Sequence, residues 1–343
     1  MILGSDSPAT QGMTEPGMAR QRHAGPTGHA PGGGVITVGG RVIRLTNVSK
    51  VLFDNGVTKG ELVEYYLAAA EVMVPLIRDR PVVMMRYPDG IEGPRIVQKN
   101  APEYFPDWIS RAEVPKRDGG TVRHVVCNDA ATLVYLANQA SIEPHVFLSR
   151  AARPECAQEI VFDLDPPPGP DSARQFGAVR RGALLVRDLL ETELGLTAFV
   201  KTTGGHGLHV HLPLDGRADF DAARDFARAV AAVLAARHPD DFTTSQRVAG
   251  RRGRIYLDIM RNAYAQTVIA AYAVRGRPGA PVATPVSWAD VEDSRLTPER
   301  FTLRTGTARL TEIRAGSDPW AGFGRRRYGV GAAQRKLATV VAA

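Results

Sequence analysis

The sequence of 343 residues contains only two cysteines, Cys127 and Cys156. Two thiols cannot build a disulfide framework or a four-cysteine zinc site, so we expect reduced, buried thiols in a cytoplasmic protein. No stretch approaches about 18 consecutive apolar residues, so the sequence predicts no membrane-spanning helix. The first residues lack the apolar core of a signal peptide. The G-K-[ST] triplet of a Walker A loop is also missing.

The charge balance is only mildly positive. Lys and Arg total 43 and Asp and Glu total 36, which gives a formal net charge of +7. This value indicates an anionic partner without identifying it. Hydrophobic residues make up 44% of the chain and charged residues 23%, values that exclude a wholly disordered protein.

The chain divides unevenly. Residues 1–34 are rich in Gly, Pro, Ser and Thr, which predicts a disordered tail. No break in composition follows, so we expect one catalytic domain over residues 35–328 and a short C-terminal tail over 329–343. A short helix is expected at 332–341, within that tail.

Hydrophobic periodicity gives the expected elements. Residues 35–45 predict a β-hairpin around Gly39-Gly40, and the capping box of Thr58 and Glu61 begins a helix over 59–77. The interleaved strands and helices include adjacent strands that form hairpins, which favours an α+β fold with a mixed or antiparallel sheet. Further strands are expected at 81–86, 95–99, 122–127, 145–148, 158–162, 197–201, 208–212, 254–257 and 267–272, and further helices at 130–140, 172–193 and 220–237.

Two acids end one of these strands. Asp163 and Asp165 are separated by one residue, so a strand places both side chains on the same face. Their mutual repulsion would be relieved by a divalent cation with oxygen ligands. The alternative is a polar turn in which an Asp caps the next helix.

Asp258 ends another predicted strand. Three carboxylates on neighbouring strands would hold two metal ions about 3.5–4 Å apart, an arrangement that serves phosphoryl or nucleotidyl transfer. The alternative for Asp258 is an ion pair with Arg254 or Arg261.

A glycine-rich segment, residues 201–211, connects two predicted strands. Its three glycines let backbone N–H groups approach an anion, and Thr203 and the histidines add donors. The alternatives are a glycine-rich structural hairpin or, for His209 and His211 on one strand face, half of a zinc site.

These motifs, in this order, resemble the primase-polymerase superfamily, and more narrowly the polymerase domain of bacterial ligase D and its stand-alone relatives. The resemblance implies a primase-polymerase catalytic core with flanking helices. The segments that carry it are 45–53, 58–61, 86–90, 98–102, 163–165, 204–209, 257–258 and 275–285.

The resemblance implies a role for each matching residue. Asp163, Asp165 and Asp258 would be the catalytic residues and would hold two divalent ions, Mn²⁺ or Mg²⁺. His206 replaces a frequent lysine, which implies weaker nucleotide binding at high pH, and Ile96-Val97 replaces a frequent aromatic residue. The nucleotide would be bound by Thr203, His206, Gly207, His209, Arg251, His145, Arg86 and Lys99.

The resemblance also implies contacts to DNA. Asn47, Lys50 and Lys59 match positions that bind the 5′-phosphate downstream of a gap, and Arg275 and Arg277 would contact DNA or the triphosphate. By their residue types alone, the lysines and these arginines are equally well explained as solvated surface charges, as is Arg251.

The resemblance implies a template-directed, metal-dependent nucleotidyltransferase, a DNA or RNA polymerase with possible primase activity, that fills gaps and extends ends in DNA repair or end joining. Its partners would be gapped or broken duplex DNA, NTPs or dNTPs, a separate DNA ligase and an end-binding protein, near the nucleoid in the cytoplasm and away from membranes. The alternatives are a metal-dependent nuclease and a non-catalytic module that bridges DNA ends.

Overall fold

The computed structural model describes residues 33–167, 169 and 171–342. The predicted tail lies outside these residues except for its last two, which begin strand β1 (Gly33–Val38). This strand pairs in antiparallel fashion with β2 (Arg41–Thr46). Gly39 and Gly40, both at positive φ, form the turn between the two strands. The predicted hairpin is therefore confirmed.

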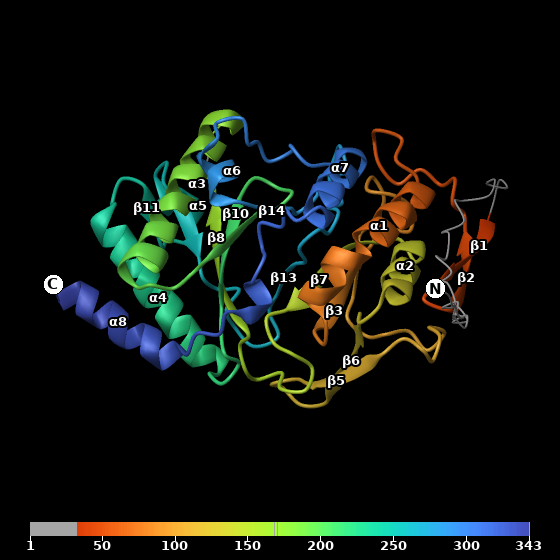
Figure 1. Ribbon diagram of the computed structural model, residues 1–343, viewed down its shortest axis with the longest axis horizontal. Coiled ribbons are helices and arrows are strands. Elements are labelled where there is room, and N and C mark those ends of the chain that lie inside the picture. Colours follow the sequence, from red (N-terminus) through yellow and green to blue (C-terminus); the bar gives the residue numbers. More distant parts are fainter. Residues whose placement is uncertain (1–32, 168, 170, 343) are drawn as a thin grey trace, which may run out of the picture. The chain divides into compact units, whose positions relative to one another are not determined.

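The first large sheet has six strands in the order β11-β12-β8-β10-β9-β14 (Figure 1). Strands β11 and β12 are parallel and the other neighbours are antiparallel, which confirms the hairpin predicted for β9 and β10. The strands are β8 (Glu159–Asp165), β9 (Phe199–Thr202), β10 (Leu208–Pro213), β11 (Phe242–Thr243), β12 (Ile255–Asp258) and β14 (Pro285–Val286).

One face of this sheet packs against helix α3 (Ser172–Arg187). A Cβ on Gly182 would stand 2.6 Å from Ile255 Cδ1 and 3.3 Å from Leu164 Cδ2, so glycine lets the helix approach the sheet closely. Because side chains alternate along a strand, Asp163 and Asp165 lie on the opposite face from Leu164. Helix packing on one face thus leaves the acids on the other.

The remaining helices of this part of the chain are α4 (Phe220–Arg237), α5 (Val248–Arg251), α6 (Trp288–Glu292) and α8 (Val330–Ala342). Helix α4 also packs against β8 and is itself contacted by α8. A π-helical turn, Asp188–Glu193, continues α3, so the predicted helix over 172–193 changes its hydrogen-bonding pattern near its end. The predicted C-terminal helix is confirmed by α8.

The second large sheet has the order β13-β7-β3-β6-β5, with β4 also paired to β3, and all of its pairs are antiparallel. Helix α1 (Lys59–Ile77) begins at the predicted capping box and contacts α2 (Ala130–Asn138) and α7 (Leu303–Arg314) (Figure 1). The strands are β3 (Pro81–Arg86), β4 (Ile96–Gln98), β5 (Arg111–Pro115), β6 (Thr121–Val126), β7 (Ser141–Phe147) and β13 (Thr267–Ile269).

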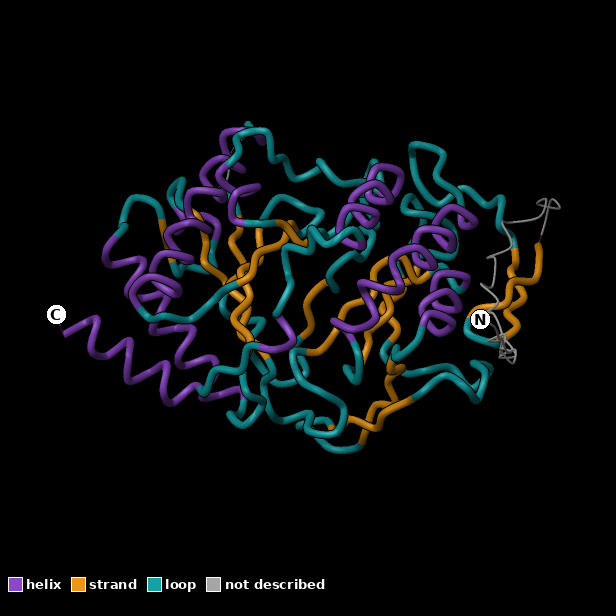
Figure 2. Tube along the Cα trace, in the orientation of Figure 1, coloured by secondary structure: helices purple, strands orange, loops and turns teal. Residues whose placement is uncertain are grey.

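Several elements differ from the sequence predictions, and their paths can be followed in Figure 2. Strands β5, β11 and β14 and helices α5 and α6 were not predicted. Strand β7 begins four residues before the predicted start at His145, because pairing with β3 overrides the low strand propensity of Glu143 and Pro144. Strand β13 ends at Ile269, three residues early. Helix α7 was not predicted, because its capping box uses Thr302 and Thr305 in place of a hydroxyl and a carboxylate.

The α+β class with largely antiparallel sheets is confirmed. Both cysteines are free and buried, as expected for structural thiols. Across the described residues, no helix combines the length and the apolar character that crossing a membrane requires.

Candidate active site

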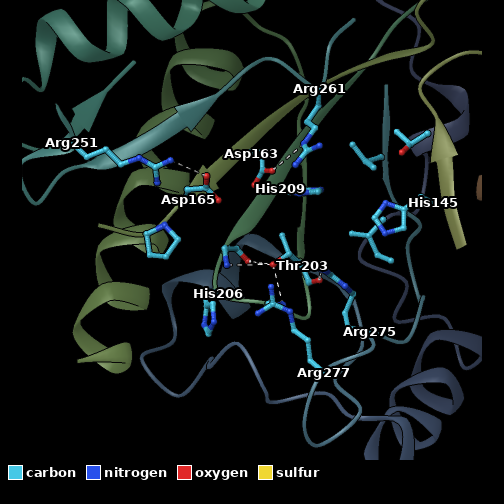
Figure 3. Close-up of a pocket in the computed structure, with 16 residues that line it drawn as sticks. His145, Asp163, Asp165, Thr203, His206, His209, Arg251, Arg261, Arg275 and Arg277 are labelled. Carbon is cyan, nitrogen blue, oxygen red and sulfur yellow. Dashed lines mark hydrogen bonds and ion pairs between the residues drawn. The ribbon is translucent and has the colours of Figure 1, made fainter. Parts of the chain in front are cut away.

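A cleft of about 390 Å³ lies between the two large sheets. Side chains from β8, β10 and the loop before β10 form one wall, and His145 of β7 with Val268 and Ile269 of β13 contributes to the other (Figure 3). The cleft therefore collects residues far apart in sequence. Its polar lining consists of His145, Asp163, Asp165, Thr203, His206, His209, Arg251, Arg261, Thr267, Arg275 and Arg277.

Four polar residues form a row across adjacent strands. Asp258 of β12 pairs with Asp163 of β8, Asp163 pairs with His209 of β10, and His209 pairs with Lys201 of β9. Directly paired residues of antiparallel strands project from the same face of the sheet. The prediction that the three acids lie on neighbouring strands is confirmed, because β8, which carries Asp163 and Asp165, pairs with β12, which ends at Asp258.

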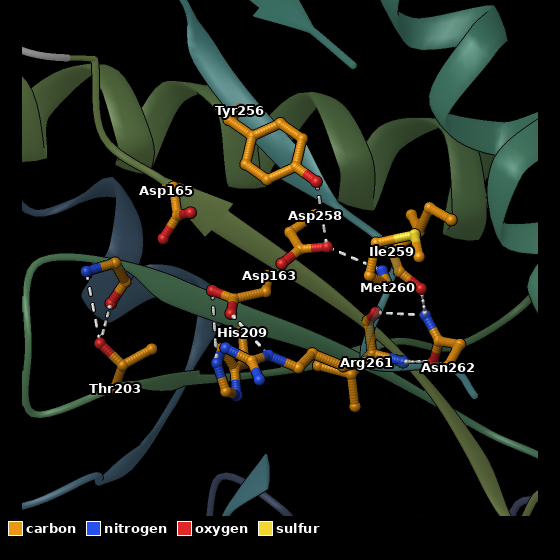
Figure 4. Close-up of polar contacts among 12 residues, drawn as sticks. Asp163, Asp165, Thr203, His209, Tyr256, Asp258, Ile259, Met260, Arg261 and Asn262 are labelled. Atoms are coloured by element: carbon orange, nitrogen blue, oxygen red, sulfur yellow. Dashed lines mark hydrogen bonds and ion pairs between the residues drawn. The ribbon is translucent and has the colours of Figure 1, made fainter. Parts of the chain in front are cut away.

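Two arginines and a histidine contact the acids, and Figure 4 shows His209 and Arg261 beside Asp163. His209 Nε2 lies 3.4 Å from Asp163 Oδ1, and Arg261 Nε lies 3.8 Å from Asp163 Oδ2. Arg251 Nη2 lies 3.7 Å from Asp165 Oδ2. Burial raises the pKa of Asp163, and burial together with repulsion by Asp163 raises the pKa of Asp165 to about 6. The repulsion between these two carboxylates would be relieved by a bound cation.

Asp258 is oriented by its own strand and the turn that follows. Its Oδ1 accepts hydrogen bonds from Tyr256 OH at 3.2 Å and from the Met260 N–H at 2.7 Å. The alternative of an ion pair with Arg254 or Arg261 is not what the structure shows, because Arg261 lies against Asp163 and Arg254 donates to backbone carbonyls. Asp258 stands beside Asp163 but outside the lining of the cleft.

The three carboxylates suit a divalent cation by their chemistry. Oxygen-only donors in a crowded, repelling cluster are the ligands that Mg²⁺ and Mn²⁺ prefer. Within the described residues, however, no three His, Cys, Asp or Glu side chains are arranged around a common point that could hold a metal. In this arrangement the arginines and His209 contact the carboxylates instead.

The glycine-rich loop before β10 closes around the hydroxyl of Thr203. Thr203 Oγ1 accepts from the N–H groups of Gly205 at 3.1 Å and Gly207 at 3.3 Å, and it donates to the Gly207 carbonyl at 3.1 Å. Gly204 has a φ of +61°, which disfavours residues with a Cβ. The hydroxyl therefore fixes the shape of the loop.

Two arginines of the 275–285 segment lie next to this loop, and one of them is hydrogen-bonded to it. Arg275 Nη1 donates to the Thr203 carbonyl at 2.7 Å, and a Cβ on Gly204 would stand 2.7 Å from Arg275 Cγ. A Cβ on Gly205 would lie 3.5 Å from Arg277 Cζ. Both arginines line the cleft, so the alternative of freely solvated loop charges does not describe them.

His145 is oriented by Glu143, a buried carboxylate that sequence reasoning missed. Glu143 Oε2 lies 3.1 Å from His145 Nε2, and Glu143 Oε1 accepts from the Gly276 N–H at 2.6 Å and lies 3.4 Å from Arg275 Nε. These contacts hold the pKa of Glu143 at about 2 despite its burial. The signal available in the sequence was an acid two residues before His145, which would share its strand face.

Arg251 stacks on an aromatic ring next to the acids. Its guanidinium lies 4.5 Å from the centre of the Tyr256 ring while it faces Asp165. Arg251 thus belongs to the cleft and is more than a solvated turn charge.

Two predicted nucleotide-binding residues lie outside the lining of the cleft. Arg86 donates from Nη1 to Gln98 Oε1 at 2.7 Å and from Nε to the Gln139 carbonyl at 2.9 Å. Lys99 follows strand β4 and is exposed. The structure does not bring either side chain together with the acids.

A second polar cluster combines Asn47, Lys50 and Lys59. The backbone N–H of Lys50 donates to the Asn47 carbonyl at 3.0 Å, and the backbone N–H of Lys59 donates to the Lys50 carbonyl at 2.8 Å. These two hydrogen bonds hold the three residues next to one another. Lys50 Nζ lies 2.8 Å from Asp89 Oδ1. The structure therefore places these residues together, away from the acids of the cleft.

Lys59 is the buried member of this cluster. Its Nζ donates to Thr46 Oγ1 and to the Asn138 carbonyl, both at 3.1 Å. Burial, followed by the charge of Lys50, lowers the pKa of Lys59 to about 8.

Comparison with known proteins places this architecture in a family. The model of the family described as LigD, primase-polymerase domain, matches residues 58–320. The chain is 35% identical over 279 residues to the multifunctional non-homologous end joining protein LigD of Pseudomonas aeruginosa, which covers 81% of this chain and 32% of that protein. It is 32% identical over 272 residues to the bifunctional LigD of Bacillus subtilis, covering 78% of this chain and 42% of that protein.

A solved structure agrees with the sequence relatives. The polymerase domain from Mycobacterium tuberculosis ligase D in complex with DNA matches with a TM-score of 0.75 and 33% identity, over 83% of this chain and 99% of that one. The chain thus spans well under half the length of the curated relatives it matches and nearly all of the solved polymerase domain. The chain belongs to the LigD primase-polymerase domain family.

Proposed function

We propose that this protein is a template-directed, metal-dependent nucleotidyltransferase that fills gaps and extends ends of broken duplex DNA. The observation that carries the proposal is the arrangement of Asp163, Asp165 and Asp258 at the ends of paired strands, next to the loop that closes around Thr203. Membership of the family of LigD primase-polymerase domains supports the same activity.

The three acids would hold two Mg²⁺ or Mn²⁺ ions, which supply activation of the attacking 3′-hydroxyl and stabilisation of the departing pyrophosphate. The protein's own side chains bind and orient the reactants. Arg275 and Arg277 provide the positive charge that a triphosphate requires at the Thr203 loop, and the His206 ring adds a hydrogen-bonding group there. Arg251 restrains Asp165, and His209 restrains Asp163.

The cluster of Asn47, Lys50 and Lys59 would bind the 5′-phosphate downstream of a gap. The two amino groups and the amide, held together by backbone hydrogen bonds, have the chemistry of an anion site. Contacts to phosphate fix the register of a protein on DNA. His145, held by Glu143, is positioned to contact the nucleotide within the cleft. Arg86 and Lys99 would need a rearrangement to reach the same nucleotide.

A primer-extension assay tests the proposal. A gapped duplex with a labelled primer is supplied with each NTP and dNTP in Mg²⁺ or Mn²⁺, with and without a 5′-phosphate. We expect the wild-type protein to lengthen the primer and Asp258→Ala to lose about 100-fold or more of the rate, since metal stabilisation contributes several kcal/mol. Asp293→Ala, which removes a surface acid paired with Arg295, is the control.

The rival functions give different results in the same assay. Shortening of the primer without added nucleotide would identify a nuclease. Binding of DNA without any extension by the wild-type protein would identify an end-bridging module. Unchanged extension by Asp258→Ala would remove that residue from the catalytic set.

A further inference from the structure

Lys201 closes the buried end of the polar row described above. It is 1% exposed and pairs across the strands with His209, which in turn pairs with Asp163. Within the described part of the chain, Lys201 Nζ has no hydrogen-bond partner. A buried amino group without a partner costs several kcal/mol, so the site must satisfy it in another way.

The nearby carboxylates are already engaged. Asp163 directs its two oxygens to His209 and Arg261. Glu159, which is on the same face of β8, contacts Arg80 with Oε1 and His211 Nδ1 with Oε2, the latter at 2.7 Å. Neither acid accepts a hydrogen bond from Lys201 Nζ.

Lys201 lines a small cavity. Its volume is about 20 Å³, and Lys201, His211, Glu159 and Arg80 are its polar lining. The rings of Trp320 and Phe323 contribute to its wall, and the His211 ring meets Trp320 at a centroid distance of 4.9 Å. A polar cavity needs about 10–15 Å³ to hold one water molecule, so this one has room for a single water.

His211 offers the complementary group. Its Nε2 is also buried without a partner among the residues described. Because Nδ1 donates to Glu159, the Nε2 of a neutral imidazole carries a lone pair and accepts. Burial lowers the pKa of His211 and so favours the neutral ring. An anion would be repelled by this lone pair, whereas water can accept from Lys201 and donate to His211.

We propose that one ordered water molecule occupies this cavity, accepts a hydrogen bond from Lys201 Nζ and donates one to His211 Nε2. The water holds the Lys201 amino group beside the acids of the row, which makes Lys201 a positioning residue for Asp163 and His209. The kinetic consequence rests on the nucleotidyltransferase activity proposed above, whereas the water site does not.

A crystal structure of the full chain at high resolution tests the water directly. We expect one water peak within hydrogen-bonding distance of both Lys201 Nζ and His211 Nε2, and its loss in Lys201→Met. An empty cavity, a direct bond from Lys201 Nζ to a carboxylate, or an anomalous bromide peak in the cavity after a bromide soak would overturn the proposal.

Kinetics of the same variant test the positioning role. In Lys201→Met we expect kcat for primer extension to fall about tenfold, as loss of one buried hydrogen-bonded group implies, with KM for the nucleotide nearly constant. The melting temperature should not fall, because the methionine removes an amino group that is costly to bury. A lower melting temperature with unchanged kcat would show a purely structural lysine.

Ile77→Val is the matched control, since Ile77 is an apolar wall residue of the same cavity. It should lower the melting temperature slightly and leave kcat unchanged. If the wild-type protein fails to extend primers, the proposed function is wrong, and the crystallographic result still decides the water site.

Discussion

Gly207 approaches strand β8 so closely that a Cβ on it would stand 2.5 Å from the Leu164 carbonyl oxygen. This contact seats the Thr203 loop against the acids, because Leu164 lies between Asp163 and Asp165. The neighbouring strand cannot yield at this point without disturbing its pairing with β10.

Gly207→Ala should therefore push the loop away from the acids. We expect a loss of about 1–3 kcal/mol in the free energy of unfolding, as for other overpacked positions, and a higher KM for the nucleotide. Chemical unfolding and primer extension measure the two effects. Gly324→Ala is the control, because a Cβ there would meet nothing within 4 Å. Equal behaviour of the two variants would contradict the role assigned to this contact.

Recognition of a 5′-phosphate should weaken above pH 8. The amino group of Lys59 has a pKa of about 8. At higher pH it is protonated in fewer molecules, so less positive charge attracts the phosphate. We expect the ratio of affinities for 5′-phosphorylated and 5′-hydroxyl gapped duplexes to fall by up to about fivefold between pH 8 and pH 9, as the protonated fraction of Lys59 does. Fluorescence anisotropy over pH 7–9.5 measures this ratio.

Lys59→Met is the variant that isolates this effect. It should lose the preference for the phosphorylated end at every pH and give a flat profile. A flat profile for the wild-type protein, with its preference intact, would show that the charge of Lys59 does not contribute.

Removing the partner of Lys50 should strengthen the same recognition. Asp89 lies 2.8 Å from Lys50 Nζ and competes with a phosphate for it. Exposed ion pairs contribute about 0.2–1 kcal/mol, so Asp89→Asn should tighten binding of the phosphorylated duplex by about 1.5–5-fold. Asp118→Asn, in the exposed pair with Lys116, makes the same change of net charge elsewhere. Equal tightening by both variants would point to net charge alone.

The buried pair of Arg80 and Glu159 should govern stability in acid. Despite burial, the charge of Arg80 and the hydrogen bond from His211 hold the pKa of Glu159 at about 2 in the folded protein, against an ordinary value of 4.5. The folded pKa is the lower one, so this stabilisation is complete above pH 4.5 and is lost as the pH falls from 4.5 towards 2. Unfolding by urea at a series of pH values measures it.

Arg80→Met should cost about 3–5 kcal/mol, because it leaves a buried carboxylate without its main counter-charge. Adding Glu159→Gln to this variant should recover part of the loss and reduce the dependence on pH between 4.5 and 2. A double variant as unstable as Arg80→Met would show that packing of the arginine, and not its charge, stabilises the protein.

Local sequence signals determined much of the fold. The helix over 59–77 follows from a capping box and apolar spacing, and the first hairpin from a glycine pair, since these interactions involve neighbours in the chain. The shared strand face of Asp163 and Asp165 also follows from spacing alone. The start of strand β7 was mispredicted because its pairing with β3, distant in sequence, decides it. Helix α7 was missed because its capping box has Thr305 where the usual pattern has a carboxylate.

The sequence by itself determined which residue types the site contains, namely the acids, the glycine-rich loop and the cations that match the family. Only the tertiary structure decided which of them meet. Strand register places Asp258 beside Asp163 and Lys201 at the far end of the same row, while Arg86 is drawn into contacts with Gln98 and Gln139. The physical reason is that register and burial depend on pairings across the whole sheet, which no local pattern encodes.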